Sequence, residues 1–168
     1  MKIQIIGYSG SGKSTLAKKL ASFYNIPYLH LDNVQYYGDF QIRDRQEQRE
    51  IVEKYILKND DWVIDGNYSD VAPSRFEISD ITIYLNYNRF YCYKMARRRY
   101  KQNKGKIRDS FPCEERFDLS FQWWILFSSR IKKRRKKHLL NLNKTKGLKL
   151  MFKNKKQLDK WLLSIGIK

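Results

Sequence analysis

The chain has 168 residues, of which 42% are hydrophobic and 15% are aromatic. This length and composition exclude a disordered chain and predict a single domain, residues 1–168, with a sizeable core. The net charge of +18, from 35 basic and 17 acidic residues, favours polyanions as partners: nucleotides, nucleic acid or an anionic membrane surface. A merely basic surface without a specific partner explains the charge equally well.

No apolar stretch approaches the roughly 20 residues that cross a bilayer, and no signal peptide is expected because a strand pattern begins at Lys2. We therefore expect a cytoplasmic protein. Its two cysteines, Cys92 and Cys113, are expected to be free thiols, and they lack the neighbouring His and Cys of a zinc site.

Apolar runs alternate with helical patterns, which predicts parallel βα units. The expected strands are 2–6, 27–31, 62–65, 81–85 and 147–152. The expected helices are 13–24 (with Leu16, Leu20 and Phe23 on one face), 44–58 (with Ile51, Val52, Tyr55 and Ile56 inward), 88–100 and 155–163. A further long helix is expected from Glu114 to about Leu140, with an apolar stripe at Phe117, Phe121, Trp124 and Ile131. The pattern indicates a three-layer α/β domain.

The segment Gly7-Tyr8-Ser9-Gly10-Ser11-Gly12-Lys13-Ser14 meets the spacing of a phosphate loop and lies between an expected strand and an expected helix. Its glycines let backbone N–H groups turn toward phosphate oxygens, and the helix adds its positive N-terminal end. We expect it to bind ATP through Gly7, Ser9, Gly10, Ser11, Gly12, Lys13, Ser14 and Thr15. Lys13 is expected to reach the β- and γ-phosphates, and Ser14 to ligate Mg²⁺.

Two acidic residues follow expected strands. Asp65 ends the apolar segment Trp62-Val63-Ile64-Asp65, where a carboxylate that supports Mg²⁺ is expected; the alternative is a turn aspartate before Gly66. Asp32 follows the second strand at the carboxyl edge of the sheet, where ligands bind. It is a candidate to orient or deprotonate a substrate hydroxyl or to assist Mg²⁺, and a helix-capping role is equally consistent with its position.

Basic residues supply candidates for the charge that a phosphoryl-transfer site must neutralise. Lys94 and Arg98 share one face of the helix 88–100, and Arg97 and Arg99 flank it. Arg108 lies in a polar segment that is expected to form a small lid-like insertion around 101–113. Arg98 and Arg108 are the preferred catalytic candidates beside Lys13 and Asp32, while a solvated basic face accounts for most of the others.

The phosphate loop, the Asp32 position and Asp65-Gly66-Asn67-Tyr68-Ser69 resemble adenylate-kinase-like proteins, and the segment through Cys113-Glu114-Glu115-Arg116-Phe117 resembles the FlaR-related group labelled "DNA topology modulation". The resemblance covers nearly the whole chain. It implies a nucleoside-monophosphate-kinase-like P-loop NTPase fold with a five-stranded parallel sheet in the order 2-3-1-4-5. The arginine that follows Asp-Gly in adenylate kinases is absent, which argues against AMP as acceptor; Arg43 or Arg45 are alternative acceptor contacts, whereas Arg75 is out of register.

Two functions are therefore expected. The first is a small-molecule or nucleotide kinase that transfers the γ-phosphoryl of ATP, with Mg²⁺, to an unidentified acceptor. The alternative is an ATP-binding regulatory protein associated with nucleic acid, through the basic run Lys132 to Lys137 and Trp123-Trp124. Against this alternative, the tryptophans are expected on the apolar face of a helix and the lysines at its solvated end.

Overall fold

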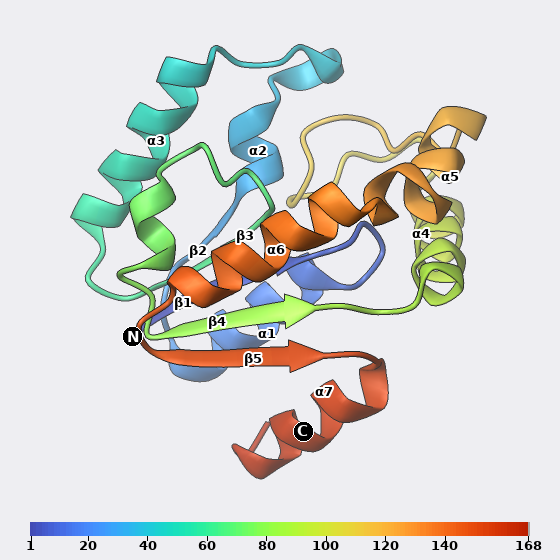
Figure 1. Ribbon diagram of the computed structural model, residues 1–168. Coiled ribbons are helices and arrows are strands. Elements are labelled where there is room, and N and C mark those ends of the chain that lie inside the picture. Colours follow the sequence, from blue (N-terminus) through green and yellow to red (C-terminus); the bar gives the residue numbers. More distant parts are fainter. Residues whose placement is uncertain (168) are drawn as a thin grey trace.

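The computed structural model describes residues 1–167 and shows a central sheet with helices on both faces (Figure 1). The sheet has five parallel strands in the order β2-β3-β1-β4-β5, which confirms the expected topology. The strands are β1 (Lys2–Gly7), β2 (Tyr28–His30), β3 (Trp62–Asp65), β4 (Ile81–Leu85) and β5 (Leu148–Phe152). The helices are α1 (Lys13–Tyr24), α2 (Leu31–Gln35), α3 (Arg45–Lys58), α4 (Arg89–Asn103), α5 (Leu119–Leu126), α6 (Lys132–Lys144) and α7 (Lys155–Ser164).

The carboxyl ends of the strands meet at one edge of the sheet, where β1 runs into the phosphate loop. In Figure 1, α6 crosses one face of the sheet and α1 lies behind the other, while α4, α5 and the segment 104–118 gather at the carboxyl edge. Parallel strands that are covered on both faces read as continuous apolar runs, as β1, β3 and β4 do here.

The core consists of two clusters, and β3 contributes side chains to both. The larger is built on Ile3, Ile5 and Ile83, and the smaller on Leu31, Val52, Trp62 and Ile64. In α1 the inward residues are Leu16, Ala17, Leu20 and Ala21, whereas Phe23, which was expected on the same face as Leu16 and Leu20, has a side chain that is 47% exposed. The inward face expected for α3 is confirmed, with Val52 buried and Ile51, Tyr55 and Ile56 packed against it.

The long helix expected from Glu114 to Leu140 is wrong. Residues 104–118 are mostly irregular, α5 ends at Leu126, and a 3₁₀ turn at Ser128–Arg130 separates it from α6. Arg130 donates from Nη1 to the carbonyl of Tyr87 at 2.7 Å and from Nε to that of Ile125 at 3.4 Å, and these bonds hold the turn against the sheet edge. Ile131 is extended (φ −60°, ψ 149°), so the basic run begins a new helix.

The short helix α2 and the 3₁₀ turns Gly38–Phe40 and Pro73–Phe76 were not expected from the sequence. Each is only three to five residues long, and at this length apolar periodicity carries little signal.

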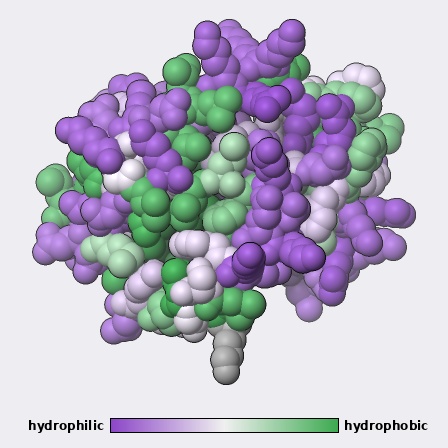
Figure 2. Space-filling view, turned by 60° about the horizontal axis from the view of Figure 1, so that its bottom comes forward, coloured by the Kyte–Doolittle hydropathy of each residue, from purple (hydrophilic) through white to green (hydrophobic). Residues whose placement is uncertain are grey.

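Hydrophilic side chains project around most of the rim of the face on which α7 lies (Figure 2). No helix among residues 1–167 is both long and apolar enough to cross a membrane.

Candidate active site

The phosphate loop joins β1 to α1, and its three glycines, Gly7, Gly10 and Gly12, have positive φ. Gly10 (φ 78°) lies so close to α4 that a Cβ would stand 2.2 Å from the carbonyl oxygen of Cys92. Gly12 (φ 88°) precedes the first residue of α1 in the left-handed region. Since the first N–H groups of a helix have no partner within it, those after Gly12 are available to an anion. The geometry is that of a phosphate cradle.

Lys13 turns back toward the loop, and its Nζ donates to the carbonyl of Tyr8 at 3.2 Å. Burial lowers the pKa of Lys13, the carboxylates of Asp32 and Asp65 raise it, and the charge of Arg99 lowers it again. The lysine therefore lies among two acids and a guanidinium. Of the other predicted nucleotide contacts, Ser11 is buried with its hydroxyl unpartnered in the described chain, Thr15 is exposed, and Ser9 is partly buried.

Asp65 is buried at the end of β3 and touches the phosphate loop. Its Oδ2 accepts a hydrogen bond from the Ser14 hydroxyl at 2.9 Å, and its Oδ1 contacts Nδ1 of the buried His30. Asp65 therefore does more than form a turn before Gly66, because its carboxylate contacts both Ser14 and His30. His30 is the buried last residue of β2, as a strand-end histidine would be, and it is paired with Asp65 in the sheet register, a contact that its position in the sequence does not indicate.

Ser14 and Asp65 fit a magnesium ion by their chemistry. A hydroxyl and a carboxylate 2.9 Å apart beside a phosphate cradle offer the hard oxygen ligands that Mg²⁺ uses together with substrate phosphates. Within residues 1–167 no cluster of three or more His, Cys, Asp or Glu residues could hold a metal without such phosphates.

Asp32 is the second residue of α2, not its cap, and its Oδ1 accepts from the Tyr68 hydroxyl at 2.8 Å. Tyr68 comes from the loop after β3, and burial and the neighbouring Asp32 carboxylate raise the pKa of its phenol. The phenol stays a hydrogen-bond donor at neutral pH. The pair presents one partly buried carboxylate at the carboxyl edge of the sheet, within charge range of Lys13.

The arginines of α4 divide between the site and solvent. Arg98 and Lys94 are exposed, as is Arg97, whereas Arg99 is partly buried and pairs through Nε with the buried Glu115. Burial lowers the pKa of Arg99, and the Glu115 and Asp32 carboxylates raise it. Arg98, the preferred candidate on α4, is therefore exposed, whereas the next residue, Arg99, pairs with Glu115.

Arg108 joins the same cluster from the segment 104–118. Its Nη2 donates to Glu115 Oε1 at 3.2 Å and its Nη1 to the Ser110 hydroxyl at 2.9 Å. Glu115 thus pairs with two guanidinium groups, one from α4 and one from the segment 104–118. The sequence carries the residues of this cluster, but nothing in their spacing singles out Glu115.

The segment 104–118 reaches across to α2 and the turn after it. Asn33 donates to the carbonyl of Asp109, the thiol of Cys113 accepts from the N–H of Phe40 at 3.2 Å, and the Phe111 and Phe40 rings are 5.7 Å apart. Lys18 of α1 also pairs with Asp109. The segment 104–118 is therefore fixed to α1, to α2 and to the turn after α2.

Arg43 and Arg45, the alternative acceptor contacts, are engaged within the protein. Arg43 donates to the Val34 carbonyl at 3.1 Å and to Glu47, and its guanidinium lies 3.9 Å from the centre of the Tyr37 ring. Arg45 donates to Gln48 at 2.7 Å and pairs with Asp70 at 3.3 Å. Arg75 is fully buried under Gln4, Val71 and Ala72, which excludes it from any ligand site.

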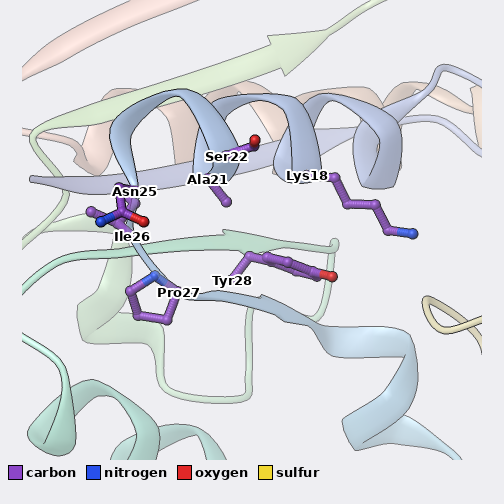
Figure 3. A pocket seen from close by; sticks show the side chains of 7 residues that line it. All are labelled: Lys18, Ala21, Ser22, Asn25, Ile26, Pro27 and Tyr28. Atoms are coloured by element: carbon purple, nitrogen blue, oxygen red, sulfur yellow. The ribbon is translucent and has the colours of Figure 1, made fainter.

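A separate shallow pocket lies away from the phosphate loop, between the second half of α1 and the start of β2 (Figure 3). Its lining offers one cation, Lys18, which is paired with Asp109, and no carboxylate. The remaining lining residues are Ala21, Ser22, Asn25, Ile26, Pro27 and Tyr28. The lining of this pocket therefore lacks the carboxylates and the glycine-rich loop that lie around Lys13.

No protein-family model and no curated protein matches the sequence. Several solved structures are similar to the chain. A shikimate kinase from Bacteroides thetaiotaomicron has a TM-score of 0.56 and 17% identity, with 98% of this chain and 95% of that chain covered. An uncharacterized protein from Eubacterium ventriosum has a TM-score of 0.50 and 17% identity over 97% of this chain and 98% of that chain. A gluconokinase from Sinorhizobium meliloti has a TM-score of 0.43 and 16% identity over 79% and 78%.

At such identities the shikimate kinase likeness shows the fold and not the substrate. The chain has a P-loop kinase fold of the nucleoside-monophosphate-kinase type, with the all-parallel sheet order found above.

Proposed function

We propose that this protein is an ATP-dependent kinase that phosphorylates a hydroxyl group of a small molecule. The observation that carries the proposal is the position of Asp32. Its carboxylate lies within electrostatic range of Lys13 and accepts from the Tyr68 hydroxyl at 2.8 Å, and the next residue, Asn33, bonds to the segment 104–118.

The residues of the site would have separate roles in binding the triphosphate and the metal ion. The loop N–H groups and Lys13 bind the triphosphate, and Arg99 and Arg108 add positive charge at the γ-phosphate end. Ser14 and Asp65 would hold Mg²⁺, which supplies charge neutralisation on the phosphate oxygens when it is bound. His30 keeps the Asp65 carboxylate in place.

The reaction then uses Asp32 as the proton acceptor. The acceptor hydroxyl oxygen forms a bond to the γ-phosphorus while the bond from that phosphorus to the β–γ bridging oxygen breaks, and ADP leaves. The hydroxyl proton passes to the Asp32 carboxylate. The lid-like segment keeps water away from the phosphoryl group, which would otherwise be hydrolysed.

The contacts on the acceptor side favour a substrate without a phosphate of its own. Arg43 and Arg45 are tied to Glu47, Gln48 and Asp70, so that a monophosphate would have to break existing bonds to recruit them. The acceptor is therefore a small hydroxyl compound.

The test is ADP release in the presence of Mg²⁺ and ATP, measured over a panel of sugars, polyols, hydroxy acids, nucleosides and nucleoside monophosphates. We expect one class of unphosphorylated hydroxyl compound to stimulate turnover, and Asp32→Asn to abolish that stimulation while ATP-analogue binding persists. If no member of the panel stimulates ADP release above the ATP-only rate, the proposal is wrong. If only nucleoside monophosphates do, the acceptor class is wrong.

A further inference from the structure

The positive charge of this protein is concentrated in one part of the chain. Residues 119–158 carry thirteen Lys and Arg and no Asp or Glu, so that they supply +13 of the net +18. They include α5, the 3₁₀ turn Ser128–Arg130, α6 and β5. A basic surface spread evenly over the molecule would not have this distribution.

The densest part is the start of α6, where Lys132, Lys133, Arg134, Arg135, Lys136 and Lys137 follow one another and are all exposed. The positive end of a helix disfavours cations, and like charges three or four positions apart repel each other. In the described structure no side chain caps this helix, and its first turn has no acid. The arrangement costs stability in the free protein, and a bound polyanion would relieve that cost.

Exposed aromatic rings lie directly before this run. The Trp123 side chain is 61% exposed and that of Phe127 is 45% exposed, with ring centroids 4.4 Å apart. The expected burial of both tryptophans on an apolar face is therefore wrong for Trp123. Trp124 is partly buried and lies under the Arg134 guanidinium at 4.0 Å, which links the rings of α5 to the cations of α6.

We propose that this basic–aromatic face, made of Trp123, Phe127 and Lys132–Lys137, binds single-stranded nucleic acid. Its cations would follow the phosphate backbone, and the Trp123 ring would stack on a base. This combination of a basic groove or ridge with solvent-exposed rings is what single-strand binding requires without sequence readout.

The geometry favours a flexible polynucleotide over a flat anionic membrane. Six consecutive residues cover more than one full turn of a helix, so that their charges point in every direction around its axis. A bilayer meets only one side of such a helix, and a peripheral helix would need a matching apolar face. A single strand can bend around the start of α6 and reach exposed cations on more than one of its sides.

The face also has a direct connection to the phosphate loop. His138, the next residue of α6, packs against the Tyr8 ring of that loop at 5.4 Å and against Tyr84 at 5.3 Å. The proposal does not depend on the kinase reaction, since binding can be measured without ATP or an acceptor, and either proposal can fail alone.

The test is the fluorescence anisotropy of a labelled oligo-dT with the full-length protein over a series of salt concentrations. Lys133→Gln with Lys136→Gln removes two cations from the face, and Lys54→Gln with Lys58→Gln removes two exposed cations from α3 as a matched control. We expect the first pair to weaken binding about tenfold and to reduce the slope of log affinity against log salt by about 1.4, and the control to change neither.

A second comparison isolates the ring. Trp123→Ala should weaken oligonucleotide binding about tenfold without changing the salt slope, whereas Leu119→Ala, at an 83% exposed position of the same helix, should have no effect. Equal losses in both lysine pairs would overturn the proposal, as would no binding at low salt. It would also be overturned if vesicles containing phosphatidylserine, and not the oligonucleotide, bound through these residues.

Discussion

Asn67 makes two hydrogen bonds to the backbone of Gly7, one with each end of its side-chain amide. Its Oδ1 accepts from the Gly7 N–H at 3.0 Å, and its Nδ2 donates to the Gly7 carbonyl at 2.7 Å. The loop after β3 is thereby fixed to the first residue of the phosphate loop. The side that carries Asp65 and Tyr68 is held in register with the side that would hold the nucleotide.

This clamp predicts that Asn67 affects nucleotide binding without touching the nucleotide. Asn67→Ala leaves the two partly buried Gly7 groups without a partner, which costs about 1–3 kcal/mol for each group that water does not reach. We expect a loss of about tenfold or more in the affinity for an ATP analogue, measured by calorimetry. Asn59→Ala removes a local bond to Tyr55 at the end of α3 and serves as the control.

The contact between His30 and Asp65 predicts a role for His30 in magnesium affinity. The imidazole fixes one oxygen of Asp65 while the other meets Ser14. Losing a residue that orients a metal ligand typically lowers metal affinity about 10- to 100-fold. His30→Ala should therefore shift the magnesium dependence of ATP-analogue binding to higher concentration, with little change in binding without magnesium.

Leu57→Ala is the control for that experiment, because the Leu57 side chain on α3 is 86% exposed. An unchanged magnesium midpoint in His30→Ala would show that Asp65 does not need its partner.

The cluster around Glu115 predicts that Arg99 matters more than its neighbours on α4. Arg99→Ala should lower kcat/KM for ATP about 100-fold, because it removes a partly buried cation within electrostatic range of Lys13. Arg97→Ala, at an exposed position of the same helix, should leave it unchanged. Glu115→Gln keeps the shape and loses the charge that gathers Arg99 and Arg108, and we expect an intermediate loss in kcat with a smaller change in stability.

A result in which Arg97→Ala and Arg99→Ala behave alike would contradict the assignment of Arg99. Arg98→Ala tests the candidate that the sequence favours. A large loss of kcat/KM for ATP in Arg98→Ala, with a nearly unchanged value in Arg99→Ala, would show that Arg98 is the functional arginine of α4.

The strand, the glycine-rich loop and the helix around Lys13 can be predicted from the sequence, because local rules determine them. The phosphate loop depends on glycines, a lysine and a serine at fixed spacing between a strand and a helix, and all of these are read along the chain. The apolar runs of β1, β3 and β4 likewise show parallel strands buried on both faces. The strand order came from a resemblance to known proteins, since pairing between distant strands leaves no local trace.

Contacts between distant segments were not predictable in the same way. Asn67 reaches Gly7 across 60 residues, and Glu115 reaches Arg99 through a segment without regular structure. On α4 the choice among Arg97, Arg98 and Arg99 depends on the rotation of the helix, which its weak apolar periodicity does not fix. The break before α6 is set by Arg130, whose partner Tyr87 lies 43 residues away.

The buried His138 predicts a loss of stability in mild acid. Burial lowers the pKa of His138 from 6.5 to about 4, helped by the charges of Lys13, Lys137, Arg130 and Arg134. Because the folded protein favours the neutral ring, the unfolded chain takes up a proton first as the pH falls. The contribution is present in full above pH 6.5 and is lost as the pH falls from there toward 4, and it is on the order of 3 kcal/mol.

Urea unfolding of the natural protein and of His138→Leu at pH 7.5, 6, 5 and 4.5 measures this contribution. Leucine keeps an apolar contact with the Tyr8 and Tyr84 rings and cannot titrate. We expect the natural protein to lose stability more steeply between pH 6.5 and 4.5 than the variant, because all other groups titrate in both. Parallel stability curves would mean that His138 is protonated as easily in the folded chain as in the unfolded one, and that the ring is solvated beside the phosphate loop.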